Sequence, residues 1–238
     1  MHKGEHFFDE MGEAVHRYLG PESVRHELEE SLRRLRTDYV DLYQTHWQDP
    51  STPIADTMGE LARLKKEGKI RAIGACNLSK AELAGYLSAG PLASIQEKFS
   101  MLDRGIEKQL LPLAREKGIA ALAYSPLALG LLSGKMKPGQ RFNGDDLRRN
   151  NPRFTDANLR KVSVLLAAVA PIAAAHQATL AQTVIAWTLA QPGITFALCG
   201  ARNPQQAREN AAAGELRLAP QELAALDEAV RQHAPGIV

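Results

Sequence analysis

The chain has 238 residues, enough for one large domain or two small ones. Its 29 Lys and Arg residues against 27 Asp and Glu leave a net charge of +2, without a polybasic block, so nucleic acid is not an expected partner. No apolar run approaches the roughly 18 residues that span a bilayer, and the N-terminus lacks the apolar core of a signal peptide. The two cysteines lie far apart in sequence, which argues against a disulfide framework or a metal site and favours a cytoplasmic location.

Residues 1–20 show no clear period and are predicted to be an irregular lead-in to one domain over residues 21–238. A helix is predicted from Gly20-Pro21, because proline suits the first turn of a helix. Its buried stripe repeats every three or four residues and is predicted to comprise Val24, Leu28, Ser31, Leu32 and Leu35.

Strands and helices are then predicted to alternate. β-branched and apolar runs predict strands over residues 39–46, 70–75, 94–99, 119–125 and 194–199. Amphipathic or alanine-rich segments with capping residues predict helices over 53–67, 79–87, 107–117, 156–176, 180–191 and 204–213, and a last one from Pro220. Residues 136–155 are predicted to be a long polar loop.

This alternation implies a parallel sheet, because helix-length segments separate successive strands. About five strands suit an open doubly wound sheet, whereas a closed (β/α)₈ barrel needs eight strands in ~250 residues. Periodicity alone does not choose between the two folds. No G-x-G-x-x-G sequence follows a strand, so the Rossmann dinucleotide fingerprint is absent.

Polar residues gather at the ends of the predicted strands, where parallel α/β folds place their function. They are His46-Trp47, Cys76-Asn77, Tyr124-Ser125 and the segment 200–202. A single histidine at a strand end is more often structural than catalytic, but several polar strand ends together favour a ligand site.

The segment after Tyr124 contains Pro126, two glycines and Lys135, a composition that suits a cofactor-binding loop and equally an ordinary turn. Arg202 precedes a predicted helix start and either binds a phosphate there or is a solvated residue of the capping loop.

Together, these residues resemble the aldo-keto reductases, and more closely their bacterial and potassium-channel-β-like branch. The resemblance runs from about residue 20 to the end. The matching segments are ESLRRL (30–35), DYVDLY (38–43), His46-Trp47, GKIRAIG (68–74), YSPL (124–127), GLLSGK (130–135) and GAR (200–202), followed by Gln206, Glu209 and Asn210.

The resemblance implies a (β/α)₈ barrel and an NADPH-dependent reductase of carbonyl compounds. His46 matches the histidine that orients the substrate carbonyl, and Tyr124 matches the aromatic ring stacked on the nicotinamide. Asn77 and Gln96 match the residues that hold the nicotinamide carboxamide, with Cys76 where the family usually has serine. The resemblance further assigns Ser125, Pro126, Leu127, Gly130 and Lys135 to the pyrophosphate loop and Arg141 to a cofactor contact in a lid-like segment. It assigns Gly200, Arg202, Gln206, Glu209 and Asn210 to the adenosine and 2′-phosphate.

One departure from the family pattern is large. The family's catalytic tyrosine, lysine and aspartate lie on strands before the histidine, and Tyr18, Tyr39 and Tyr43 do not match that tyrosine's context. The matching text begins after the family's third strand, so strands four to eight of the barrel are expected. The first three strand–helix units, of roughly 30 residues each, are expected to be missing. The chain is therefore expected to be an incomplete reductase, inactive on its own, through either a wrong start or a genuine loss.

The alternative interpretation is a non-catalytic relative that binds a cofactor or a partner. A different phosphate-binding barrel enzyme is disfavoured by the breadth of the match. The expected ligand is NADP(H) with a small carbonyl substrate, without nucleic acid, membrane or metal. The particular substrate and the oligomeric state do not follow from the sequence.

Overall fold

The structure is a computed structural model that describes residues 6–8, 14–144 and 146–237. The contacts divide the chain into two compact units, which we describe separately. The first comprises Met1–Glu97 and Lys108–Ala121, and the second comprises Lys98–Glu107 and Leu122–Val238.

The first unit begins with a small antiparallel hairpin. β1 (His6–Phe8) pairs with β2 (Ala14–His16), with His6 opposite His16. The prediction of an irregular lead-in over residues 1–20 is therefore wrong for these two segments. Strands of three residues are too short to display a period of two in the sequence.

Helix α1 (Pro21–Leu35) follows, with proline in its first turn as predicted. Val24, Leu28 and Leu32 are buried, but Leu35 is 63% exposed, so its assignment to the buried stripe is wrong. Arg36 ends the helix in the left-handed conformation, and Leu35 therefore lies in the last turn, beyond the apolar contacts.

The sheet of the first unit is parallel, as predicted. β3 (Val40–Thr45) pairs with β4 (Ile70–Cys76), which pairs with β5 (Ser94–Lys98). The connections are α2 (Ile54–Lys66) and α3 (Lys80–Ala89). α4 (Leu110–Glu116) then leads into β6 (Ala120–Tyr124), within which the chain passes to the second unit.

The register places Gln44, Gly74 and Ser94 side by side across three strands, and Cys76 beside Gln96. Gln44 donates a hydrogen bond to Ser94 across Gly74 at 3.2 Å. Side chains alternate between the two faces of a strand, so these residues share one face and their neighbours share the other.

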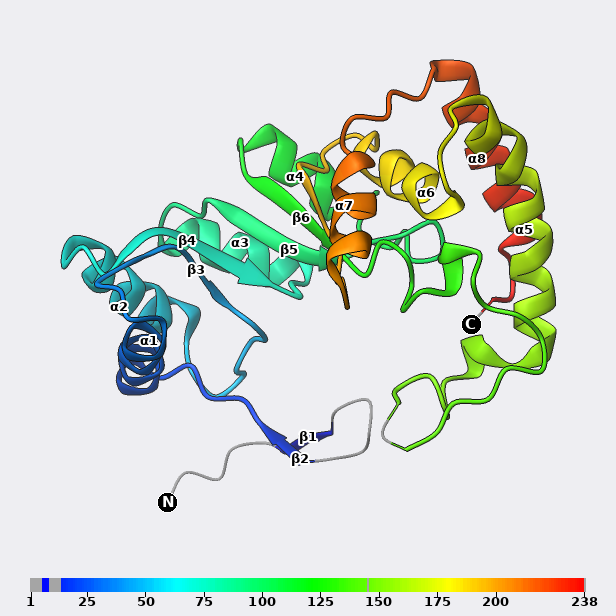
Figure 1. The fold of residues 1–238 in the computed structure, drawn as a ribbon. Coiled ribbons are helices and arrows are strands. Elements are labelled where there is room, and N and C mark those ends of the chain that lie inside the picture. Colours follow the sequence, from blue (N-terminus) through cyan, green and yellow to red (C-terminus); the bar gives the residue numbers. More distant parts are fainter. Residues whose placement is uncertain (1–5, 9–13, 145, 238) are drawn as a thin grey trace. The chain divides into compact units, whose positions relative to one another are not determined.

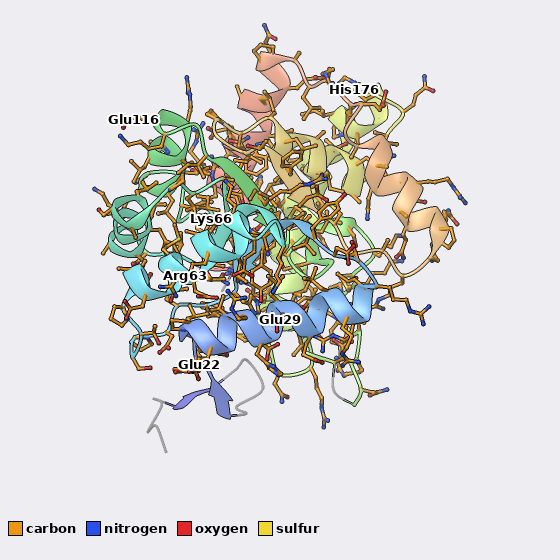
Figure 2. All side chains as sticks on the ribbon, turned by 90° about the vertical axis from the view of Figure 1, so that its left-hand side faces the viewer. Glu22, Glu29, Arg63, Lys66, Glu116 and His176 are labelled. Atoms are coloured by element: carbon orange, nitrogen blue, oxygen red, sulfur yellow. The ribbon has the colours of Figure 1, made fainter. Side chains whose placement is uncertain are left out.

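Charged side chains join α1 to α2 and to the start of β4. Arg25 bonds the buried carboxylate of Glu60 at 2.7 Å and also binds Glu67, while Lys69 binds Glu29 at 2.7 Å. Glu29 on α1 and Arg63 on α2 are labelled in Figure 2. Arg63 also contacts Glu60, at 3.2 Å. The buried Glu60 is thus neutralised from both helices.

In the second unit, β6 pairs in parallel with β7 (Phe196–Leu198), with Tyr124 opposite Leu198. The helices are α5 (Asp156–Ala175), α6 (Leu180–Leu189), α7 (Pro204–Ala212) and α8 (Pro220–His233), with short 3₁₀ helices at Leu131–Ser133 and Pro152–Phe154. α5 and α8 run side by side (Figure 1). The core centres on Trp187, fully buried and stacked on Phe99 at 5.9 Å between ring centroids.

The predicted elements differ from the structure mainly at their ends. All five predicted strands are present, but the last is limited to Phe196–Leu198. The helix predicted over 107–117 begins at Leu110, because residues 105–109 form turns. Ser79 caps α3 as predicted, in a reciprocal capping box with Glu82.

α5 is long and apolar enough to cross a membrane by length and composition, alone among the helices in the described part of the chain. The expectation that no segment would meet this criterion is therefore corrected. α5 packs against α6 and α8, and a core helix of a globular domain meets the same criterion.

A pair of glycine substitutions tests the packing of the first unit. A Cβ on Gly74 would lie 2.3 Å from Ser94 Oγ and 2.8 Å from Gln44 Cγ, so Gly74→Ala should lower the free energy of unfolding by about 1–3 kcal/mol. Gly59, inside α2, has nothing within 4 Å of its Cβ position, and Gly59→Ala should raise stability by about 0.5–1 kcal/mol. Urea unfolding followed by circular dichroism measures both, and equal effects would contradict the register described.

Candidate functional site

The ends of the first unit's strands meet at Asn77. Asn77 directly follows β4, and its Nδ2 donates a hydrogen bond to the carbonyl of His46 at 2.8 Å. Its backbone N–H bonds the carbonyl of Gln96 on β5 at 3.1 Å. The structure therefore brings together three residues that the sequence assigned to one site.

The backbone of Asn77 is in the left-handed region, with φ of 56°. Non-glycine residues rarely adopt this conformation, although asparagine tolerates it better than most. Such backbone strain is concentrated at functional sites, where surrounding contacts enforce it. The bonds to His46 and Gln96 are contacts of this kind.

Cys76 is buried beneath the turn. Burial raises the pKa of its thiol to about 12, with a smaller contribution from the charge of Glu97. The thiol stays protonated near neutral pH and is a weak hydrogen-bond donor where the family usually has a hydroxyl. Its carbonyl accepts a hydrogen bond from Gln48 Nε2 at 3.2 Å.

A buried polar network supports the strand ends from the helix side. The Tyr86 hydroxyl on α3 donates to Gln48 Oε1 and shares a 3.0 Å hydrogen bond with Thr45. Because Gln48 also bonds the Cys76 carbonyl, the network joins the segments after β3 and β4. The segments that carry His46 and Asn77 are thereby fixed through α3.

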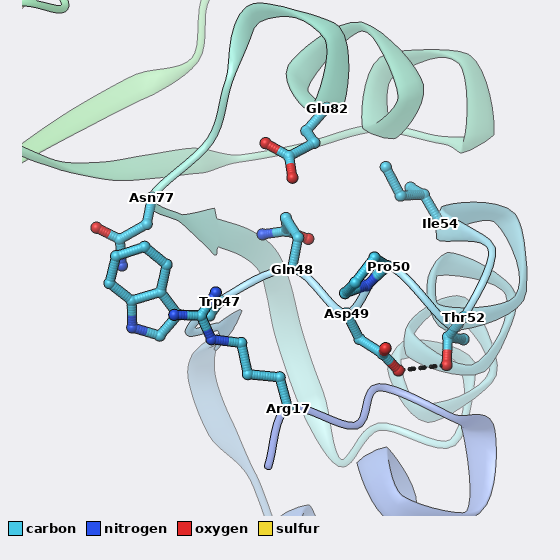
Figure 3. Close-up of a pocket in the computed structure, with 9 residues that line it drawn as sticks. All are labelled: Arg17, Trp47, Gln48, Asp49, Pro50, Thr52, Ile54, Asn77 and Glu82. Carbon is cyan, nitrogen blue, oxygen red and sulfur yellow. Dashed lines mark hydrogen bonds between the residues drawn. The ribbon is translucent and has the colours of Figure 1, made fainter. Parts of the chain in front are cut away.

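A cavity of about 480 Å³ opens beside this turn (Figure 3), a size typical of small-molecule sites. The Arg17 guanidinium lies over Trp47, 4.4 Å from the ring centroid, and the Glu82 carboxylate is directed into the cavity from α3. The lining residues are Arg17, Trp47, Gln48, Asp49, Pro50, Thr52, Ile54, Asn77 and Glu82.

Sequence reasoning singled out only Asn77 and the His46-Trp47 pair from this region. Arg17 lies in residues 1–20, which were predicted to be irregular. The position of Glu82, three residues after Ser79, indicates a capping role for α3. Asp49 carried one usable signal, since it begins the Asp49-Pro50 turn shortly after the end of β3. Its carboxylate accepts bonds from the hydroxyls of Ser51 and Thr52.

The second set of predicted residues lies in the other unit, starting with the loop after β6. Ser125, Ala128 and Leu129 have φ of 56°, 47° and 55°, and Gly130 has 87°. Alanine and leucine are rarely found in this conformation. The loop is held by backbone bonds, among them those from Gly130 and Leu132 to the carbonyl of Leu127, at 2.9 and 3.1 Å.

Around this loop, Tyr124 is half-buried, Pro126 is buried and Lys135 is exposed. Lys135 donates its backbone N–H to Ser133 Oγ at 3.3 Å. Arg141 is 75% exposed and lies 3.8 Å from Asp156. Both cationic side chains therefore project into solvent.

The remaining predicted residues lie in the segment after β7 and on α7. Asn210 Nδ2 donates to the Gly200 carbonyl at 3.1 Å, and the Arg202 N–H bonds Gln206 Oε1 at 2.8 Å. Glu209 accepts from Gln205 at 3.0 Å. Four of the five residues assigned to the adenosine end are thus joined pairwise, and the Arg202 side chain is exposed.

Arg202 also contributes to an arginine-rich surface. A hydrogen bond from Arg148 is the main cause that holds the pKa of Asp146 down, at about 2, and the charge of Arg202 lowers it further. Asp146 bonds Arg148 at 2.5 Å. Because Arg148 neutralises Asp146, that carboxylate opposes anion binding near Arg202 only weakly.

A sequence profile of the Aldo/keto reductase family matches residues 5–231. The chain belongs to this family. It is 43% identical over 215 residues to a protein named NADH-specific methylglyoxal reductase from Escherichia coli K12, a match that covers 89% of the chain and 65% of the relative. Aldo-keto reductase YhdN from Bacillus subtilis is 39% identical over 194 residues, covering 80% and 58%.

Solved structures agree with this assignment. A glycerol dehydrogenase from Gluconobacter oxydans superposes with a TM-score of 0.88 at 35% identity and covers 94% of the chain and 68% of that structure. The thermostable aldo-keto reductase Tm1743 gives 0.70 at 29% identity, covering 89% and 67%. The fold is therefore of the (β/α)₈ type. The chain spans 65% of the length of the E. coli relative and 58% of the length of the B. subtilis relative.

Tyr86 provides a test of the network beneath the site. Tyr86→Phe removes a hydroxyl that bonds both Gln48 and Thr45, leaving buried polar groups without a partner, which typically costs about 1–3 kcal/mol. We expect a lower urea midpoint with an unchanged slope. Tyr39→Phe, at a residue that is 38% exposed, is the matched control, and an equal loss in both variants would contradict the network.

Proposed function

We propose that this chain is part of an NADP(H)-dependent oxidoreductase that reduces aldehydes or ketones to alcohols. The observation that carries the proposal is the hydrogen-bonded assembly of His46, Asn77 and Gln96 at the strand ends. A bound nicotinamide cofactor supplies hydride to a carbonyl carbon. Membership of the family supports the assignment, and a cytoplasmic location is part of the proposal.

The first unit fits the nicotinamide end of such a cofactor. A carboxamide offers an N–H₂ and a carbonyl, which the amide side chains of Asn77 and Gln96 complement. Among the described residues the half-buried Gln96 side chain has no hydrogen-bond partner. His46, which is exposed, would donate a hydrogen bond to the carbonyl oxygen and orient it.

The second unit offers a donor set suited to the rest of the cofactor. Tyr124 would stack on the nicotinamide ring, and the strained loop after it would approach the pyrophosphate closely. The residues proposed for the pyrophosphate are Ser125, Pro126, Leu127, Gly130 and Lys135, and Arg141 is proposed as a further cofactor contact. Those proposed for the adenosine and its 2′-phosphate are Gly200, Arg202, Gln206, Glu209 and Asn210.

The polar cavity beside Asn77 favours a small, polar carbonyl substrate. Arg17, Gln48 and Glu82 offer a cation, an amide and a carboxylate around about 480 Å³. The E. coli relative is named for methylglyoxal, a compact dicarbonyl, which is consistent with this choice.

A second candidate function is a non-catalytic relative that binds cofactor or a partner. The tyrosines ahead of His46 favour it. Burial raises the pKa of Tyr43, helped by the charge of Glu27, which is the opposite of what a catalytic acid beside a cation requires. Tyr39 lies under the Arg71 guanidinium, and both residues are exposed.

Turnover tests whether this chain catalyses the reduction by itself. Without a proton donor near the carbonyl oxygen, rates typically fall 10²–10⁴-fold, so we expect residues 1–238 to bind cofactor but show no measurable NADPH oxidation with methylglyoxal or nitrobenzaldehyde. Robust turnover by this chain that His46→Ala abolishes would show that a proton donor is present after all.

Arg202 tests the choice of cofactor. A 2′-phosphate beside Arg202 gains a charge-assisted hydrogen bond of roughly 1.5–3 kcal/mol, so Arg202→Ala should weaken NADPH binding about tenfold or more and leave NADH binding little changed. Fluorescence titration of both cofactors measures this.

Arg231→Ala, on the exposed surface of α8, is the control and should change neither affinity. The NADP(H) assignment would be contradicted if Arg202→Ala lost the same affinity for both cofactors. It would also be contradicted if the chain bound NADH tightly and did not bind NADPH. The E. coli relative is named as NADH-specific, so tight NADH binding without NADPH binding is the more informative of these two outcomes.

A further inference from the structure

A buried carboxylate lies directly beneath the turn that carries Asn77. Glu97 follows Gln96 on β5 and is only 5% exposed. Successive strand residues face opposite sides of a sheet, so Gln96 faces the site while Glu97 shares the helix side with Ile95, which is fully buried. An acidic residue in this apolar row needs an explanation, because burying a carboxylate is costly.

The Glu97 carboxylate accepts a hydrogen bond from the backbone of this turn. The Leu78 N–H donates to Glu97 Oε1 at 2.9 Å, and the neighbouring Asn77 N–H, which bonds the Gln96 carbonyl at 3.1 Å, also lowers the pKa of the carboxyl. These amides form the turn in which Asn77 has its left-handed backbone. Glu97 therefore holds the turn from the helix side, while Gln96 and His46 hold it from the other.

The pKa of the Glu97 carboxyl lies close to neutral pH. Burial raises the pKa of its carboxyl to about 7, the amides of Leu78 and Asn77 lower it, and the charge of Glu82 on α3 raises it. The charge of Glu97 in turn helps to raise the pKa of the Cys76 thiol on β4 to about 12, so that thiol stays neutral. In the described part of the chain no cation forms an ion pair with Glu97.

We propose that Glu97 is a positioning residue that holds Asn77 in place for the nicotinamide carboxamide, more firmly when its carboxyl is ionised than when it is protonated. Ionised acceptors make stronger hydrogen bonds than neutral ones. Loss of the proton therefore tightens the turn, and gain of a proton loosens it. This inference rests on the proposed role of Asn77 in cofactor binding.

A purely structural carboxylate predicts something different. It would lower stability when replaced, but it would not make the geometry of Asn77 or the binding of cofactor follow its own titration. The test therefore needs a readout at the turn itself and a second readout at the cofactor, each measured against pH.

The first readout is the amide chemical shift of Asn77 and Leu78 in ¹⁵N-labelled chain from pH 5.5 to 8.5. We expect both amides to titrate together with a midpoint near pH 7, and Glu97→Gln to abolish that titration. Glu116→Gln, an exposed carboxylate on α4, is the matched control and should leave it unchanged. Flat amide shifts in the unaltered chain overturn the proposal, whether or not the variant folds.

The second readout is the dissociation constant for NADH, which lacks a 2′-phosphate that itself titrates in this range. One hydrogen bond that changes from charged to neutral loses about 1 kcal/mol, so affinity should fall about fivefold from pH 8 to pH 6. Glu97→Gln should bind at the weaker level at both pH values, and Glu116→Gln should follow the unaltered chain.

Two failures are distinguishable. If NADH binds but Glu97→Gln keeps the same pH dependence as the unaltered chain, the positioning role is wrong and the proposed function stands. If the amides titrate as expected but neither NADH nor NADPH binds to any variant at any pH, the proposed function fails for this chain, and with it the link from Glu97 to the cofactor.

Discussion

The arrangement of the candidate site depends on one strained turn. Asn77 adopts a left-handed backbone at the end of β4, and two neighbouring strands help to hold the turn: His46 follows β3, and Gln96 and Glu97 lie on β5. A conformation that costs about 1–3 kcal/mol persists only where its surroundings over-determine it. Two of the surrounding residues, His46 and Gln96, are also proposed to contact a ligand.

The second unit also contains strained backbone, which is held by hydrogen bonds within a loop. The loop after β6 places Ser125, Ala128 and Leu129 in the left-handed region, and its carbonyls and amides bond within the loop. Leu131 and Leu132 are fully buried and anchor it. In both units, non-glycine residues with positive φ follow a buried strand, which is where parallel α/β folds place their ligands.

The sequence was sufficient to predict the elements with strong periodicity. The five parallel strands and the capping of α3 are as expected, because apolar runs and capping residues are local signals. The polar strand ends indicated His46 and Asn77, whereas Gln96 was assigned only through the family resemblance. The hairpin β1–β2 was missed because three-residue strands carry no period. The exposure of Leu35 was missed because helix ends depend on the conformation of the residue that follows.

The supporting groups around the site were not predictable from local pattern. Glu97 reads as a surface residue between Gln96 and Lys98, and only the pairing of β4 with β5 places it beneath the turn. Arg17 and Glu82 reach the cavity from distant positions in the chain. Their roles depend on tertiary contacts, which one sequence without covariation does not reveal.

The most direct test of this account separates the backbone of Asn77 from its side chain. Asn77→Gly keeps a residue that adopts positive φ freely but removes the amide. If that amide holds the nicotinamide carboxamide, NADH should bind roughly tenfold more weakly at pH 8, since two hydrogen bonds of about 0.5–1.5 kcal/mol are lost, while the urea midpoint changes little. Unchanged NADH affinity in Asn77→Gly would contradict the account.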